Sequence, residues 1–347
     1  MFNHLLALVM AASLGACGAT PTESFPMSDH YSPKTGFYNP PGSPQRLAGF
    51  WEMQRFMWAA LVSGRADPVV PPGHVLSHEQ AANGWANTKG DKLQWFGHSA
   101  FRWQLGKTVL LSDPFLTDRA SPLGFAGPKR FAPSPLAPED ATADVIIISH
   151  NHYDHLDINT LKRLPNKQTV QVIVPLGVGP LVRSAGIAHV TELDWHQNIK
   201  VGDVTVTLLP AVHFSARWLN DRNQTLWGGF MVEGHGKKIY VSGDTTYHPT
   251  VFKDIGKRYG PFDYGIVAIG AYEPRRIMIA SHVNPEEGVQ IGKDIGAKTL
   301  IPEHWGAIRL TTEPAFEPPV RYIAAAQKAG YAAADTWQMK IGETRRW

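Results

Sequence analysis

The sequence contains only one cysteine, Cys17, so no disulfide can form within the chain, and its stability must come from a packed core and any metals that it binds. It also lacks a run of lysine or arginine: 33 basic residues are scattered among 30 acidic ones, and the formal net charge is only +3. We therefore expect no nucleic-acid partner. At 347 residues the chain can bury one large core, and we expect one main domain preceded by an N-terminal extension.

The N-terminus lacks an apolar run that is long enough to span a bilayer, because residues 5–16 are too few and end in small side chains. This pattern is typical of a signal peptide, which we place at residues 1–16. Residues 14–17, L-G-A-C, resemble a bacterial lipobox, in which the cysteine becomes the first mature residue and carries lipid. We expect a protein held on the membrane surface through lipidated Cys17, in the bacterial cell envelope at the outer membrane or the periplasmic face. No Lys or Arg precedes the apolar run, so an ordinary cleaved signal or an uncleaved N-terminal anchor is the alternative.

Two further segments precede the main domain. Residues 17–44 are rich in Pro, Ser, Thr, Gly and Asn, a composition that buries little apolar area and predicts a lipid-anchored linker. Residues 45–90 are predicted to form a helical extension, because apolar and aromatic side chains recur at helical spacing between positions 47 and 62. This stripe predicts a helix that packs on the core. The alternative is that Phe56, Met57 and Trp58 extend the apolar surface and line a path for acyl chains or rest on a bilayer.

Strand patterns dominate the rest of the chain, with short helical patterns at residues 159–164 and 285–295. The predicted strands are residues 93–96, 101–104, 108–111, 145–148, 172–174, 204–209, 229–232, 238–241 and 264–269. Strands and helices mixed at this spacing indicate sheets that are covered by helices. We therefore expect an α/β domain over residues 91–347.

The richest cluster of potential metal ligands is S-H-N-H-Y-D-H-L-D at residues 149–157, directly after an apolar strand. Side chains of an extended strand repeat every second residue, so His150 and His152 project to one side and can meet one cation. Asp154 and His155 then face a second position. A lone H-x-H pair can equally be two structural histidines, but the longer H-x-H-x-D-H pattern resembles that of metallo-β-lactamase-type binuclear hydrolases. It implies a histidine, a bridging aspartate and a last histidine downstream.

Three residues that follow strand patterns match these missing ligands: His213 in L-L-P-A-V-H, Asp244 in V-S-G-D-T and His304 in I-P-E-H-W-G. We assign His150, His152 and His213 to one metal, and Asp154, His155 and His304 to the other, with Asp244 as the bridge. Histidine and carboxylate ligands without thiolate suit two Zn²⁺ ions, with Mn²⁺ or Fe²⁺ as alternatives. Such a pair of ions supplies a hydroxide that is nucleophilic near neutral pH, which predicts hydrolysis.

Other candidate residues lie near these motifs. Asp113, in L-L-S-D-P, is predicted to orient a ligand histidine, although Asp-Pro also starts turns. His98, in W-F-G-H-S, is expected near the site. His282, in A-S-H-V-N-P, is with Asp244 a candidate catalytic residue, because it precedes a helix and can protonate a leaving oxygen or bind a phosphate. A helix-capping or core histidine is the alternative for His282.

Longer segments resemble one family more specifically. From about residue 113 to the C-terminus, the chain resembles the N-acylphosphatidylethanolamine-hydrolysing phospholipase D family, a branch of the metallo-β-lactamase superfamily. The resembling segments include S-D-P-F-L-T-D-R-A-S-P (112–122), L-N-D-R-N-Q-T-L-W-G-G-F (219–230), I-G-A-Y-E-P-R (269–275) and H-V-N-P-E-E (282–287). The resemblance implies a four-layer αββα fold with the metals at one edge of the sheets, the same seven ligands, and a histidine at position 282 beside the active site.

The same resemblance implies a phospholipid substrate. Water would attack the phosphorus of an N-acylated phosphatidylethanolamine and release an N-acylethanolamine and phosphatidic acid. One alternative is hydrolysis of another bond at the same centre, such as a lactone, an amide or another phosphodiester. The other is a non-catalytic envelope lipoprotein that uses the fold for binding. The sequence leaves the oligomeric state open between a monomer and a homodimer.

Overall fold

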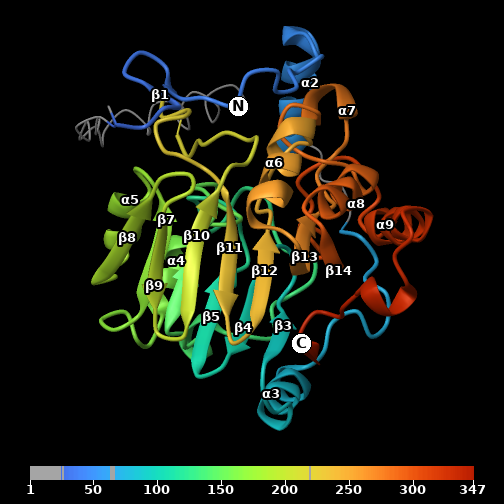
Figure 1. The fold of residues 1–347 in the computed structure, drawn as a ribbon. Coiled ribbons are helices and arrows are strands. Elements are labelled where there is room, and N and C mark those ends of the chain that lie inside the picture. The colour runs from blue at the N-terminus through green and yellow to red at the C-terminus, as the bar shows by residue number, and fades with distance from the viewer. Residues whose placement is uncertain (1–24, 26, 63–66, 219) are drawn as a thin grey trace.

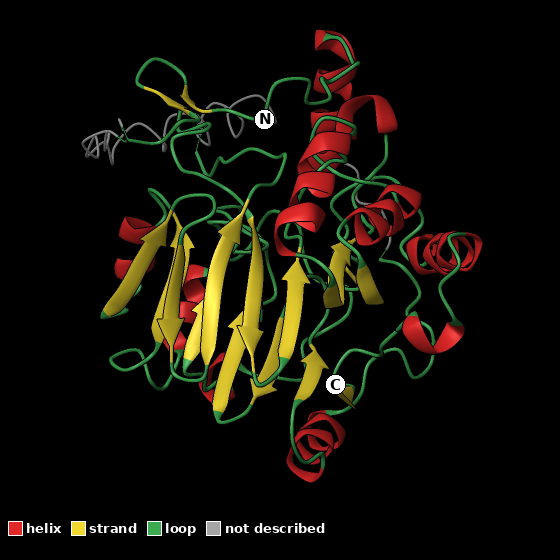
Figure 2. Ribbon diagram, viewed as in Figure 1, coloured by secondary structure: helices red, strands yellow, loops and turns green. Residues whose placement is uncertain are grey.

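The computed structural model describes residue 25 and residues 27–62, 67–218 and 220–347. The predicted signal peptide and Cys17 lie outside these described residues, so the lipid anchor stays a prediction. Two β-sheets stand face to face and helices flank them (Figure 1, Figure 2). This four-layer αββα arrangement confirms the predicted α/β fold.

One sheet has seven strands in the order β15-β3-β4-β5-β6-β7-β8. Its strands are β3 (Lys92–Trp95), β4 (Phe101–Leu105), β5 (Thr108–Ser112), β6 (Val145–Ile147), β7 (Gln171–Pro175), β8 (His189–Leu193) and β15 (Thr344–Arg346). Neighbours from β15 to β5 pair antiparallel, and neighbours from β5 to β8 pair parallel. The C-terminal strand β15 therefore closes one edge of this mixed sheet.

The other sheet has six strands in the order β14-β13-β12-β11-β10-β9. Its strands are β9 (Asn198–Val201), β10 (Val204–Leu209), β11 (Gly229–Gly234), β12 (Lys237–Val241), β13 (Phe262–Ala268) and β14 (Ala297–Glu303). All nine predicted strands are present in the two sheets. The predicted strands do not include β8, β9, β14 and β15, although β14 contains the strand pattern that precedes His304. The edge strand β9 was missed because none of its four residues is buried and its sequence N-I-K-V gives little strand signal.

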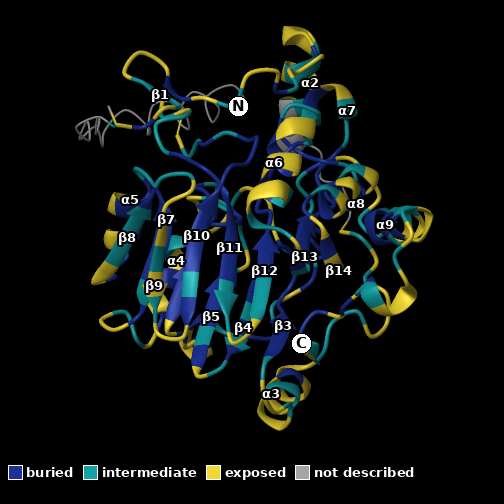
Figure 3. Ribbon diagram, viewed as in Figure 1, coloured by how far each residue is buried: buried dark blue, intermediate teal, exposed yellow. Residues whose placement is uncertain are grey.

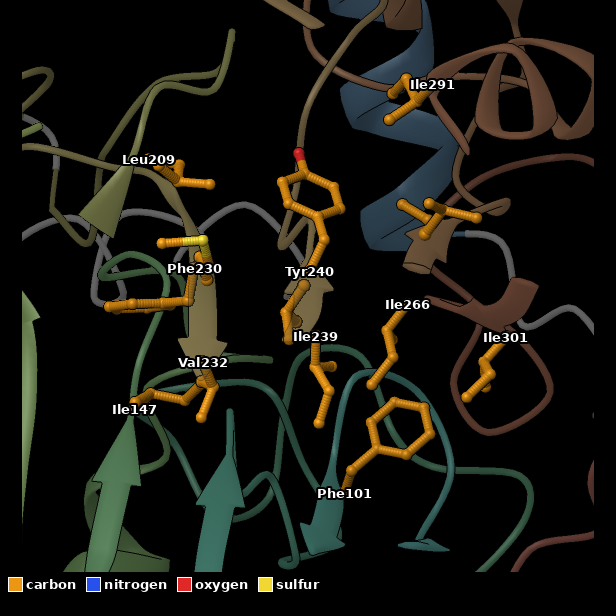
Figure 4. Packing of buried hydrophobic residues seen from close by; sticks show 14 of the residues in the cluster. Phe101, Ile147, Leu209, Phe230, Val232, Ile239, Tyr240, Ile266, Ile291 and Ile301 are labelled. Atoms are coloured by element: carbon orange, nitrogen blue, oxygen red, sulfur yellow. The ribbon is translucent and has the colours of Figure 1, made fainter. Parts of the chain in front are cut away.

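The alternation of side chains along β6 shows how one strand serves two cores. Val145 and Ile147 point into the core between the sheets, while Ile146 and the following Ile148 belong to a second apolar cluster under the helices. Figure 4 shows Ile147 close to Phe230 and Val232 of the opposite sheet. Burial on both faces explains why the strand is an unbroken apolar run.

The helices cover the outer faces of the sheets. The described helices are α2 (Phe50–Val62), α3 (His78–Asn87), α4 (Ile158–Arg163), α5 (Gly179–Arg183), α6 (Pro249–Tyr259), α7 (Arg275–Met278), α8 (Pro285–Asp294) and α9 (Glu317–Lys328). α4 and α5 pack on the seven-stranded sheet, α6 and α8 pack on the six-stranded sheet, and α9 packs on α8. The predicted helices at 159–164 and 285–295 correspond to α4 and α8.

Residues 27–44, which we call the N-terminal segment, differ from the linker that their composition predicts. They form a short hairpin of β1 (Tyr31–Ser32) and β2 (Gly36–Phe37), and Phe37 is only 1% exposed within the main core. Buried Phe37, partly buried Tyr31, the stacking of His30 on Trp195 and the hydrogen bonds of Asn39 hold this segment on the fold, although most of its residues are small or polar.

The helix predicted between residues 47 and 62 is present as α2, but its aromatic side chains do not pack on the core. Phe50, Trp51 and Trp58 are 66%, 78% and 59% exposed, and Figure 3 shows exposed residues along α2. Among the described residues, none of the helices has the length and apolar character that crossing a bilayer requires. The exposed aromatic side chains therefore form a surface feature of this helix.

Candidate metal centre

The seven predicted ligands meet at one edge of the sheets, in the loops that follow β6, β10, β12 and β14. Each ligand lies within a few residues of a buried strand end, so the sheet restricts where its side chain can point. Six of the seven are buried, and only His152 is partly exposed. The structure thus brings every predicted ligand together, while metal binding by each of them stays a prediction.

Four side chains surround the first metal position. His150 Nε2 lies 2.8 Å from His152 Nδ1, and His213 Nε2 lies 3.2 Å from the same His152 nitrogen. Asp244 Oδ2 is 3.6 Å from His150 Nε2 and 3.5 Å from His213 Nε2. Three imidazole nitrogens and one carboxylate oxygen therefore converge, as the sequence predicts for this position.

Hydrogen bonds behind the first position set the tautomers of two ligands. His213 Nδ1 donates to the carbonyl of Ser281 at 2.8 Å. His150 Nδ1 donates to Ser149 Oγ at 2.9 Å, and that hydroxyl donates to Asp113 Oδ2 at 2.6 Å. Each Nε2 atom is left with its lone pair facing Asp244, which is the orientation that a metal ligand needs.

A second set of ligands surrounds the other position. Asp154 Oδ2 lies 3.4 Å from His155 Nε2 and 3.5 Å from His304 Nε2. Asp244 reaches this set as well, since its Oδ2 is 3.3 Å from His155 Nε2 and its Oδ1 is 3.0 Å from His304 Nε2. Asp244 is therefore placed between the two positions, where a bridging carboxylate belongs.

Asp113 makes the contact with a ligand histidine that its place in the sequence predicts. Its Oδ2 accepts a hydrogen bond from His155 Nδ1 at 2.7 Å, and its Oδ1 accepts one from the backbone N–H of Ser149 at 2.7 Å. The carboxylate thereby fixes the tautomer of His155 and leaves its Nε2 atom for a metal.

His98 is an additional member of the second set. Its Nε2 atom lies 2.8 Å from Asp154 Oδ2, and its ring packs on the ring of His304 with centroids 4.0 Å apart. Burial lowers the pKa of His98 to about 3, so the imidazole is neutral and donates its Nε2 proton to Asp154. Its backbone φ of +56°, which is rare for a residue with a side chain, aims the ring at this carboxylate. His98 therefore lies at the site, as expected, and holds a predicted ligand.

His282 lies beside both positions. Its Nδ1 atom is 3.9 Å from Asp244 Oδ2 and has no hydrogen-bond partner among the described residues. The helix-capping alternative is wrong, because Asn284 caps α8 through a capping box with Glu287. His282 thus presents a buried, unpaired nitrogen to the centre.

At the second position, the carboxylates and the histidines shift one another's pKa values. Burial opposes ionisation of Asp154 and Asp244, but the neighbouring histidines outweigh burial and hold the pKa of both carboxyls well below the usual value. Burial also opposes the charging of His155 and His304, but the carboxylates raise the pKa of His155 well above its usual value and that of His304 to about 9. A cation that binds here must therefore displace protons from histidine.

The unpaired atoms test whether metal ions fit. His155 Nε2, His304 Nε2 and Asp244 Oδ1 are buried without a hydrogen-bond partner among the described residues; the last two lie 3.0 Å apart, but their orientation makes no hydrogen bond. Burial holds the pKa of His150 well below the usual value and lowers that of His152 to about 4, so two neutral nitrogens face each other at 2.8 Å. Bound cations would give the unpaired atoms a partner and would accept the lone pairs of the neutral nitrogens. The nitrogen-rich clusters therefore suit a binuclear metal site.

Two arginines that the sequence analysis did not single out as site residues hold the ligand loops. Arg217 donates to the carbonyls of Asn151 and Leu156 at 2.7 and 2.8 Å, across the loop that carries the H-x-H-x-D-H motif. Buried Arg130 donates to the carbonyls of Phe96 and Phe115, next to His98 and Asp113. Arg130 stands in the G-P-K-R-F segment of the family resemblance, whereas no local pattern marks Arg217.

Comparison with known proteins agrees with this geometry. Residues 108–305 match the family model described as the β-lactamase superfamily domain, over more than half of the chain. The chain belongs to the metallo-β-lactamase superfamily. Solved structures of similar fold include an isothiocyanate hydrolase from Delia radicum gut bacteria, with a TM-score of 0.59, 20% identity and coverage of 74% of this chain and 99% of that one. Igni18, a metallo hydrolase of Ignicoccus hospitalis, has a TM-score of 0.55, 20% identity and coverage of 74% and 97%. These likenesses show the metallo-β-lactamase fold.

Sequence relatives within the superfamily are closer. An uncharacterized protein of Mycobacterium tuberculosis is 42% identical over 241 residues, which is 68% of this chain and 64% of that relative. The N-acyl-phosphatidylethanolamine-hydrolyzing phospholipase D 1 of Caenorhabditis elegans is 39% identical over 253 residues, 70% of this chain and 71% of the relative. A mitochondrial protein of the same activity name from Saccharomyces cerevisiae is 32% identical over 244 residues, 68% and 52% of the two chains. This chain thus spans less than two thirds of the mycobacterial and yeast relatives.

Proposed function

We propose that this metallo-β-lactamase-fold protein is a zinc-dependent phosphodiesterase that cleaves N-acylphosphatidylethanolamine into N-acylethanolamine and phosphatidic acid. The observation that carries the proposal is the convergence of seven histidine and aspartate side chains, six of them around Asp244. The similarity to the worm and yeast proteins named for this reaction supports the choice of bond.

The residues of the centre have separate tasks in this reaction. His150, His152 and His213 would hold one ion, Asp154, His155 and His304 the other, and Asp244 would touch both. When bound, the two ions would lower the pKa of a water molecule, and they would place positive charge beside the phosphate. Because burial lowers the pKa of His282 to about 4, its imidazole is neutral near pH 7 and acts as a hydrogen-bond donor to a phosphate or leaving oxygen.

The lipid part of the substrate has a matching surface. Trp51, Phe56 and Ile277 belong to an open groove of about 550 Å³ between α2 and α7, and α7 leads directly into the loop of His282. We infer that acyl chains lie in this groove while the exposed aromatic side chains of α2 rest on a bilayer. A lipid-anchored location in the bacterial envelope fits this proposal, and mass spectrometry of the mature N-terminus tests it: acylated Cys17 supports it and an intact Met1 contradicts it.

Lipid-product analysis tests the reaction. The purified protein is incubated with N-acylphosphatidylethanolamine, a second phosphodiester, a lactone and an amide, before and after removal of metal by a chelator. We expect N-acylethanolamine as the main product, and loss of turnover on chelation. Asp244→Asn should lower turnover by more than about 100-fold, because it removes a ligand shared by both ions and not merely an outer contact.

The matched control is Asp254→Asn, which makes the same chemical change at an exposed carboxylate of α6. Turnover that survives both chelation and Asp244→Asn would contradict the mechanism. Faster turnover of the lactone or amide would support the alternative bond. Fewer than two ions per chain, with no turnover of any compound, would support the non-catalytic lipoprotein.

A further inference from the structure

We propose that Asn39, in the N-terminal segment, is a positioning residue that sets the affinity of the first metal position by holding His213. The side-chain amide of Asn39 pairs with both backbone groups of this ligand. Asn39 Nδ2 donates to the carbonyl of His213 at 2.8 Å, and the N–H of His213 donates to Asn39 Oδ1 at 3.1 Å. The two residues are 174 positions apart in the sequence.

This pairing replaces a strand neighbour that His213 does not have. β10 ends at Leu209, so the ligand lies beyond the sheet and outside the ladder of backbone hydrogen bonds. His213 is only 1% exposed, so its N–H and C=O groups need protein partners. Asn39 supplies both, and its Oδ1 also accepts from Trp227 Nε1 at 3.1 Å.

The N-terminal segment holds Asn39 firmly from both sides. On one side, Phe37 is buried and its N–H donates to the carbonyl of Asn223 at 2.8 Å. Gly36 has a φ of +75°, and a Cβ there would collide with Asn223, so only glycine fits this close approach. On the other side, His248 Nε2 donates to the carbonyl of Pro41 at 3.1 Å. Asn39 is therefore a fixed group on which the ligand loop can rest.

The contact acts on one metal position only. With its backbone held by Asn39 and its Nδ1 held by Ser281, His213 has its Nε2 atom directed at His152 and Asp244. Within the described part of the chain, the hydrogen bonds of Asn39 go to His213 and Trp227 and not to the ligands of the second position. Loss of Asn39 should therefore weaken the first ion and leave the second unchanged. Outer partners of metal ligands typically contribute 10- to 100-fold to metal affinity.

Competitive titration with a chelator measures this effect without a substrate. Zn²⁺ is added stepwise to the metal-free full chain of the parent protein, Asn39→Ala and Asn39→Asp. We expect about 10- to 100-fold weaker binding of one of the two ions in both variants. Asn39→Asp keeps the acceptor for the His213 N–H but loses the donor, and its carboxylate repels the His213 carbonyl. Tyr38→Phe is the matched control, because Tyr38 lies in the same segment and its hydroxyl, among the described residues, bonds to the carbonyl of Asp29 and not to the site.

A double-mutant cycle separates positioning of the ligand from general stability. If Asn39 acts through the His213 imidazole, Asn39→Ala should change ion affinity less than threefold once His213→Ala is present. An equal loss of affinity in the parent and in the His213→Ala background would overturn the proposal. Unchanged binding of both ions in Asn39→Ala would overturn it as well. So would an equal weakening of both ions together with a lower melting temperature. If Asn39→Ala does not fold, Asn39→Asp decides by the same criteria. Because the titration uses no substrate, its result can support or contradict the role of Asn39 whether or not the proposed function is correct.

Discussion

Glu303 is a carboxyl group that the fold encloses completely beside the metal centre. It is 0% exposed, its Oε1 accepts a hydrogen bond from Ser242 Oγ at 2.9 Å, and its Oε2 has no partner among the described residues. Burial and the negative charge of Asp113 raise the pKa of Glu303 to about 8, against the weaker effects of Ser242 and His155. In the metal-free protein this side chain is therefore a neutral acid at pH 7.

The raised pKa makes Glu303 a source of pH-dependent instability. Between its usual value of 4.5 and its folded value of about 8, the folded chain keeps a proton on Glu303 that the unfolded chain has released. The unfolded state then binds fewer protons, so the free energy of unfolding falls as the pH rises. The loss is about 1.4 kcal/mol per pH unit, or about 3 kcal/mol at pH 7 and about 5 kcal/mol above pH 8.

Glu303→Gln removes this titration and keeps the size of the side chain. Urea unfolding of the metal-free parent and variant, from pH 5 to pH 8.5, gives the difference in free energy of unfolding at each pH. We expect the variant to gain on the parent by about 1.4 kcal/mol per pH unit up to pH 8, because titrations common to both chains cancel. Any constant cost of the new amide shifts the whole curve and leaves its slope unchanged.

Glu79→Gln, at an exposed carboxylate in the first turn of α3, is the control and should show no such slope. A difference between parent and Glu303→Gln that stays flat with pH would refute the reasoning. A variant that loses stability relative to the parent as the pH rises would refute it as well, because Glu303 would then be ionised and stabilising in the fold.

Two further predictions concern the second metal position and the surface of α2. Asp113→Ala removes the direct acceptor for His155 Nδ1 and should weaken the second ion by about 10- to 100-fold, measured by the same chelator titration. The first ion should weaken less, because Asp113 reaches His150 only through the hydroxyl of Ser149; an equal or larger loss at the first ion would contradict this. Replacing Trp51 and Trp58 by serine should lower binding to phosphatidylethanolamine–phosphatidylglycerol vesicles by more than about tenfold. Both side chains are exposed in the structure, and each would contribute about 1–2 kcal/mol to binding when the bilayer buries it. Val320→Ser, at a 68% exposed residue of α9, should leave vesicle binding unchanged, and equal binding by all variants would count against the membrane contact.

The convergence of the predicted ligands could be inferred from sequence because each of them lies shortly after a strand pattern. The apolar run of β6 leads into His150 and His152, and the run of β14 leads into His304. Two-residue periodicity then decides which side chains share a side. The spacing of these residues along the chain therefore carries most of the geometry of the site.

The supports behind the ligands are less predictable, because they depend on contacts between distant segments. Asn39 and His213 are 174 residues apart, and Arg217 is 66 residues from the Asn151 carbonyl that it binds. Composition predicts a linker up to residue 44, since small and polar residues rarely bury enough area to fold. Here Phe37 is buried in the main core, and side-chain contacts of His30 and Asn39 with distant residues add to the backbone hydrogen bonds.

The predicted ligands and the residues that support them differ in whether they lie inside the segment that matches the superfamily. The segment that matches the superfamily model, residues 108–305, contains all seven predicted ligands as well as Asp113 and His282. Asn39, His98 and the exposed aromatic residues of α2 lie before it. The match to the superfamily therefore covers the predicted ligand set, whereas these N-terminal residues lie outside the matched segment. Under the proposals made above, Asn39 tunes the first metal position and α2 meets the lipid. We therefore expect substitutions in residues 27–62 to alter metal affinity and lipid binding while the predicted ligand set stays the same.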